Sequence, residues 1–224
     1  MAHAFFLGID VADDTSDTPG AVTATLLEKS DDATDAPQYR LDSIAHYDAS
    51  PDADDLADRF QSLVADSPYT GRTTLVVHTG PSFGQSLFDA LEDRGLAPVS
   101  VTLTGGRSAA PAGTDDMGVH LAEFDAIDRL TRAYRDGRLD LEGPSSEHVS
   151  QLARGIQSFV AAATDEEDAT ETPDALDAEP QRPEAFDTHV TSAALALWTG
   201  AERSFDPTEH LKDTPRTEVS PPMA

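Results

Sequence analysis

Hydrophobic blocks alternate with polar segments along the first fifty residues. The stretches AFFLGIDVA (4–12), AVTATLLEK (21–29) and YRLDSIAHY (39–47) are short and rich in β-branched and aromatic residues. Polar segments with turn-forming residues separate them. These features predict three strands, and the two short connections predict an antiparallel meander.

The next part of the chain alternates helical and strand patterns. Apolar residues recur at helical spacing over 50–66, where Ser50 is a candidate N-cap. A strand over 73–79, a helix over 82–95 and a strand over 97–105 follow. This order predicts a β-α-β unit with two parallel strands.

Helical patterns dominate the rest of the chain. Amphipathic helices are predicted over 120–137 and 145–163, with a short strand candidate at 138–143 between them. A low-complexity acidic segment then precedes a final apolar helix.

Three antiparallel strands followed by two strands in β-α-β linkage form the ribonuclease-H-like topology. The sequence therefore predicts an α/β fold with a five-stranded mixed sheet flanked by helices. The predicted organisation is a core over 1–163, a disordered acidic insert over 164–185, a closing helix over 186–203 and a flexible tail over 204–224.

The sequence is strongly acidic. The formal net charge is −27, with 42 acidic residues against 15 basic ones, and only two of the basic residues are lysines, Lys29 and Lys212. This composition indicates a halophilic protein whose self-repulsion is screened at molar salt, where the Debye length is about 3 Å. The absence of cysteine excludes disulfides and thiolate chemistry. Without a signal segment or a long apolar run, we expect a cytoplasmic protein without membrane contact.

Polar residues stand at three places that the predicted topology brings together. Asp10 ends the first strand, His78 ends the fourth strand and Asp187 opens the last helix. In this fold the ends of the first and fourth strands are neighbours, and a late helix places its N-terminus beside them. Phosphodiester hydrolysis at such a place uses two divalent metals held by clustered carboxylates.

Four segments resemble the nuclease domain of phage terminase large subunits, over about 130 residues in the same order. They are FLGIDVADD, LVVHTGPSFGQSLFDALEDRGLAPVSVTLTGG, DAIDRLTRAYRDGRLDLEG…HVSQLARGIQSFV and FDTHVTSAALALW. The resemblance implies a Mg²⁺- or Mn²⁺-dependent DNA endonuclease for viral or proviral DNA packaging. It also implies catalytic and metal-binding roles for Asp10, His78 and Asp187.

The resemblance has departures. The family carries an ATPase motor, but no G-x-x-x-x-G-K-[ST] occurs in this sequence, so we expect no nucleotide cofactor and a separate packaging ATPase or other viral proteins as partners. His78 stands where the family has an acidic residue, and Thr188 replaces a second aspartate. Neutral imidazole is a poor ligand for Mg²⁺. We therefore expect a degraded site with one weakly held metal or none.

Other interpretations stay open. The fold can serve as a non-catalytic scaffold, or as a module that binds DNA or protein, with the acidic insert as a tether or DNA mimic. An actin-like ATPase shares the GID of the first strand, but the chain is short for two lobes. Asp187 is also a natural N-cap, and His189 can join His78 as a nitrogen ligand.

Two further features have structural and functional interpretations. Arg129, Arg132 and Arg135 recur on one predicted helix, where they can contact phosphates or form a solvated face. Trp198 near the end of the last helix fits the core better than a base-stacking platform.

Overall fold

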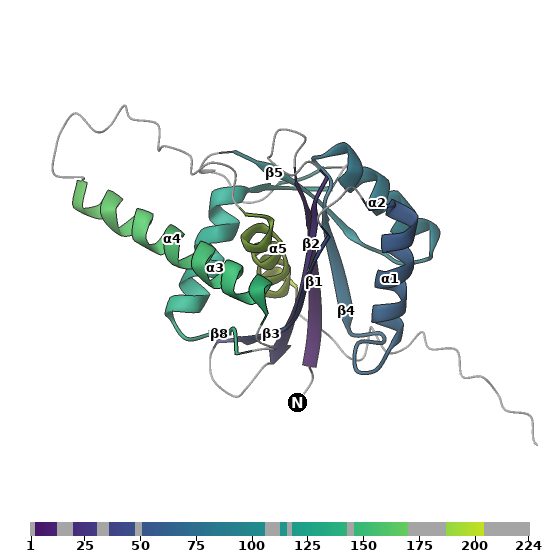
Figure 1. The fold of residues 1–224 in the computed structure, drawn as a ribbon, viewed down its shortest axis with the longest axis horizontal. Coiled ribbons are helices and arrows are strands. Elements are labelled where there is room, and N and C mark those ends of the chain that lie inside the picture. Colours follow the sequence, from purple (N-terminus) through teal and green to yellow (C-terminus); the bar gives the residue numbers. More distant parts are fainter. Residues whose placement is uncertain are drawn as a thin grey trace, which may run out of the picture.

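The computed structural model describes residues 3–12, 20–30, 36–47, 51–105, 113–115, 118–142, 146–169 and 187–203. Within these ranges the chain forms one mixed sheet with helices on both faces (Figure 1). The helices are α1 (Ala53–Ala65), α2 (Ser82–Asp93), α3 (Glu123–Arg135), α4 (Glu147–Ala169) and α5 (Thr188–Glu202). No helix in the described part of the chain is long and apolar enough to cross a membrane.

The described sheet has eight strands in the spatial order β6-β7-β5-β4-β1-β2-β3-β8. They are β1 (His3–Val11), β2 (Val22–Ser30), β3 (Gln38–Tyr47), β4 (Thr73–His78), β5 (Val99–Thr104), β6 (Gly113–Asp115), β7 (Gly118–Ala122) and β8 (Leu139–Asp140). The prediction of five strands is therefore wrong in number. The additional strands are short and extend the two edges of the sheet.

The predicted strand directions are confirmed. β1 pairs antiparallel with β2, and β2 pairs antiparallel with β3. β4 lies parallel to β1 on its other side, and β5 lies parallel to β4. The centre of the sheet thus has the order β5-β4-β1-β2-β3, which places the ends of β1 and β4 side by side.

Element boundaries differ from the predictions in three places. The N-cap of α1 is Asp52, whose carboxylate accepts hydrogen bonds from two backbone N–H groups of the first turn; Ser50 lies outside the described residues. Residues 118–122, the last three of which were predicted as helix, form β7, because pairing with β5 overrides a weak local preference. Helix α4 continues to Ala169, so the segment predicted as a disordered insert begins as helix. Residues 170–186 and 204–224 lie outside the described residues.

The two faces of the sheet bury separate hydrophobic cores. Alternate residues of β1 point to opposite faces, so Phe6 belongs to one core and Phe5, Leu7 and Ile9 to the other. Helices α3, α4 and α5 cover the Phe6 side, and α1 and α2 cover the other side (Figure 1). This layering explains why the strands near the centre are apolar on both faces.

Helix α5 is the most buried helix of the described structure, with every residue from His189 to Gly200 buried. It lies against β1 at Gly8, where an added Cβ would stand 2.1 Å from the backbone oxygen of Ser192. Across the neighbouring strand, Thr25 and Ser192 share a hydrogen bond of 2.7 Å between their hydroxyl oxygens. At the other end of the helix, the buried Lys29 donates from Nζ to the carbonyl oxygen of Gly200 over 2.9 Å. The helix is thus held to the sheet in its first half, at Ser192, and near its C-terminal end, at Gly200.

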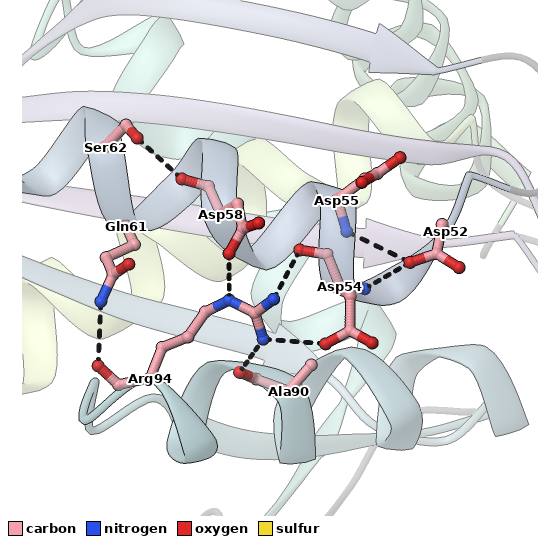
Figure 2. A network of polar contacts seen from close by, with 8 residues as sticks. All are labelled: Asp52, Asp54, Asp55, Asp58, Gln61, Ser62, Ala90 and Arg94. Carbon is pink, nitrogen blue, oxygen red and sulfur yellow. Dashed lines mark hydrogen bonds and ion pairs between the residues drawn. The ribbon is translucent and has the colours of Figure 1, made fainter.

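The helices on the opposite face are joined by one arginine (Figure 2). Arg94, which follows α2, donates to the carboxylates of Asp58 and Asp54 on α1 over 2.6 and 3.0 Å. It also donates to the backbone oxygens of Asp54 and Ala90. Part of the large acidic surplus therefore has a structural role, because it holds α1 to α2.

We predict that Gly8→Ala destabilises the fold by about 1–3 kcal/mol or more, because the new methyl group has no space between β1 and α5. Urea denaturation in multimolar KCl measures the change, with Ser62→Ala on the exposed side of α1 as control. A denaturation midpoint equal to that of the unmodified protein would contradict the close contact.

Candidate functional site

A row of polar side chains crosses the sheet beneath the start of α5. Asp10 lies opposite Thr23 on β2, and Thr23 lies opposite His46 on β3. Asp10 faces the α5 side, because Gly8, two residues earlier on the same strand, contacts α5. Three adjacent strands thus contribute a polar residue at the same level of the sheet.

His78 extends this row to β4. Its Nδ1 lies 2.8 Å from Oδ1 of Asp10, and both side chains are largely buried, with exposed fractions of 13% and 6%. The expectation that the ends of the first and fourth strands bring Asp10 and His78 together is confirmed. A hydrogen bond from Nδ1 to a carboxylate fixes the orientation of an imidazole ring.

The turn after β4 fits closely around this ring. An added Cβ at Gly80 would stand 2.7 Å from Nε2 of His78. A side chain at position 80 would therefore push the imidazole away from Asp10, so the glycine keeps space for the pair.

Asp187 is the N-cap of α5, as one interpretation of the sequence predicts. Its Oδ1 accepts hydrogen bonds from the backbone N–H of His189 over 3.0 Å and from Nδ1 of the same residue over 2.5 Å. Burial raises the pKa of the Asp187 carboxyl, but these hydrogen bonds and the charges of His189 and His46 outweigh it, so its pKa lies below the ordinary value. The ionised carboxylate is favoured.

Hydroxyl groups connect the start of α5 to the polar row. Oγ1 of Thr188 lies 2.6 Å from Oγ1 of Thr23, which in turn lies 2.8 Å from Nδ1 of His46. Thr188 occupies the position where the family resemblance implies an aspartate. Here its side chain links the helix to the sheet.

The expected metal-binding set does not form. Among the described residues, no group of three or more histidine, aspartate or glutamate side chains is arranged to hold a metal ion. Asp10 and His78 are paired with each other, and Asp187 is paired with His189. The donors in the described part of the chain therefore do not fit a two-metal centre.

A cluster of three histidines lies at the same end of the sheet, and the sequence did not predict it. The ring centroids of His46 and His189 are 4.9 Å apart, those of His148 and His189 are 5.2 Å apart, and those of His46 and His148 are 5.6 Å apart. His189 thus joins His46 and His148, whereas the sequence suggested His78 as its companion. These residues come from β3, α4 and α5, so no local spacing could have indicated the cluster.

The remaining candidates have structural contacts. Arg129 pairs with Glu202 over 2.6 Å, and Arg132 pairs with Asp128 over 2.8 Å, so two of the three arginines on α3 already have carboxylate partners. Trp198 is 8% exposed and packs in the core beside α3 and α4, as expected for a core residue.

The chain was compared with known proteins. No protein-family model matches it. No curated protein matches it. Among solved structures, it is similar to the large terminase from a thermophilic bacteriophage, with 12% sequence identity and a TM-score of 0.45. This match covers 69% of the chain and 31% of the terminase, so the chain spans about a third of that protein's length.

The chain is also similar to RuvC from Thermus thermophilus, with 12% identity and a TM-score of 0.33 over 89% of this chain and 97% of RuvC. At these identities and TM-scores, neither likeness assigns a role to any residue of this chain.

We predict that His78→Ala lowers the free energy of unfolding by about 1–3 kcal/mol, because the buried carboxylate of Asp10 loses a hydrogen-bond partner. The double variant Asp10→Asn/His78→Ala should lose less than the sum of the two single variants, because it buries no unpaired charge. Urea denaturation of all four proteins measures the coupling. Additive losses would show that the two side chains do not stabilise one another.

The lowered pKa of Asp187 predicts a pH dependence. A carboxyl whose folded-state pKa is depressed stabilises the fold above its unfolded-state value of about 3.9, and this contribution is lost as pH falls through the folded-state pKa. Asp187→Asn keeps a side chain that can cap the helix but removes the charge. The stability difference between the unmodified protein and this variant should therefore be present at pH 6 and disappear in strong acid. A difference that stays constant over this range would contradict the assignment.

Proposed function

We propose that this chain is a ribonuclease-H-like domain related to the terminase nucleases, with a role in processing or packaging viral or proviral DNA. The observation that carries the proposal is the pairing of Asp10 and His78 at the adjacent ends of β1 and β4, in a sheet with the central order β5-β4-β1-β2-β3. The start of α5, with Asp187 as its cap, lies over the same polar row through Thr188. These are the three places for which the sequence suggested the candidates Asp10, His78 and Asp187.

The residues present support a degraded nuclease site. Two closely spaced divalent metals need several converging carboxylates, but His78 replaces one of them and Thr188 another. Imidazole favours Mn²⁺ or Zn²⁺ over Mg²⁺ and adds no negative charge. The Asp10–His78 pair keeps an oriented imidazole at this place, because the carboxylate lies 2.8 Å from Nδ1 of the ring.

A non-catalytic module on the same fold is the second candidate. Hydrogen bonds among the polar groups favour this candidate. The carboxylate of Asp187 is hydrogen-bonded to His189, and the hydroxyl of Thr188 is hydrogen-bonded to Thr23. In this case the domain binds DNA or a viral protein partner, and the polar row stabilises α5.

The test is cleavage of plasmid DNA in multimolar KCl with Mg²⁺, Mn²⁺ or Zn²⁺. For a degraded site we expect no cleavage with Mg²⁺, and any cleavage with Mn²⁺ should disappear in Asp10→Ala but persist in Asp93→Ala, a control on the exposed surface of α2. His78→Asp should melt at a lower temperature than the unmodified protein without divalent metal, because two buried carboxylates then repel each other. Mn²⁺ should reverse this loss and promote cleavage.

The outcomes separate the two candidates. Rapid cleavage that survives Asp10→Ala would exclude this site as the catalytic centre. If His78→Asp shows neither a metal-dependent rise in melting temperature nor cleavage, while the exposed control His120→Asp behaves like the unmodified protein, the nuclease-derived site is rejected. The non-catalytic module then remains.

A further inference from the structure

We propose that His148 and His189 form a binding site for a nitrogen-preferring divalent transition metal such as Zn²⁺, Ni²⁺ or Cu²⁺. The two residues open helices α4 and α5, respectively. This site uses neither Asp10 nor His78, but it shares with the proposed nuclease site the carboxylate of Asp187, which orients His189.

The separation of two ring nitrogens carries the proposal. Nδ1 of His148 lies 3.1 Å from Nε2 of His189. A metal at the usual Zn–N distance of about 2.1 Å from both nitrogens would form an N–metal–N angle of about 95°. Angles near this value occur in square-planar, octahedral and distorted tetrahedral sites. Metal binding would displace the proton that the two nitrogens now share, and the metal would lie to one side of the line that joins them.

Nδ1 of His189 is hydrogen-bonded to a carboxylate, an arrangement that is common for histidines that bind metals. Nδ1 of His189 is 2.5 Å from Oδ1 of Asp187, and that carboxylate is fixed in turn by the backbone N–H of His189. A carboxylate bound to one ring nitrogen selects the tautomer whose other nitrogen has a lone pair. The lone pair of Nε2 is thereby directed at His148.

The surroundings hold the pair in place and leave access from one side. The ring of His46 stacks on His189 with an interplanar angle of 23°, and Thr23 fixes His46 through Nδ1. His189 is 3% exposed, whereas His148 is half-buried in the first turn of α4. A metal ion therefore reaches the two nitrogens from the His148 side.

The two imidazole nitrogens are the proposed donors, and Oε1 of Gln151 lies 3.4 Å from Nδ1 of His148. The described residues contain no metal-binding group of three or more such side chains, so water or an incoming ligand completes the coordination. Mg²⁺ prefers oxygen ligands and would not bind, whereas Zn²⁺, Ni²⁺ and Cu²⁺ accept imidazole. A bound metal would connect α4 to α5 and stabilise their contact.

The experiment titrates the full chain in multimolar KCl with ZnCl₂ or NiCl₂, and with MgCl₂ for comparison. Saturating Zn²⁺ should raise the melting temperature by about 4 °C or more, because the ion binds the folded state. Correlation spectra of the imidazole nitrogens should shift for His148 and His189. Both effects should be absent with Mg²⁺ and lost in His148→Ala.

Two control variants make the result specific. His120→Ala, an exposed histidine on β7, and Asp10→Ala should both keep the Zn²⁺ response. Retention in Asp10→Ala separates this site from the proposed nuclease site, whichever way the cleavage test ends. Unchanged His148 and His189 signals on Zn²⁺ addition, or an equal response in His148→Ala, would overturn the proposal.

Discussion

The close contact between β1 and α5 determines the rest of the structure. Because Gly8 has no side chain, the backbone of α5 packs closely against the backbone of the central strand β1. The helix is therefore buried along most of its length, and its polar residues Thr191, Ser192 and Thr199 are buried with its apolar ones. Its first turn must then lie over the polar row that begins with Asp10. The glycine at position 8 thus allows the close contact that places the start of α5 over the candidate site.

Polar groups can remain in this central layer because each has a partner close by. Asp10 has His78, Thr23 has Thr188 and His46, and Asp187 has His189. A buried polar group without a hydrogen bond would destabilise the fold. The network avoids this cost, because it supplies hydrogen-bond partners without a bound metal. The same network connects strands β1, β2 and β3 to the start of α5.

The sequence predicted the features that depend on local periodicity and chain order. Strand order at the centre of the sheet, the meeting of Asp10 with His78 and the cap at Asp187 all follow from strand ends and a helix start. The short edge strands β6, β7 and β8 were missed or left uncertain, because two to five residues have little intrinsic preference and take their form from a neighbouring strand. The histidine cluster was beyond the reach of sequence reasoning for a different reason. His46, His148 and His189 are separated by 102 and 41 positions, and only the packing of α4 and α5 against β3 brings their rings together.

Lys29 gives this fold an internal chemical reporter. It is one of two lysines in the chain, and its amine is buried against the last turn of α5. An amine-selective reagent would therefore label Lys29 slowly while α5 is docked and rapidly once the helix detaches. The labelling rate at this single residue measures how often the central helix opens, at any salt concentration and without an introduced probe.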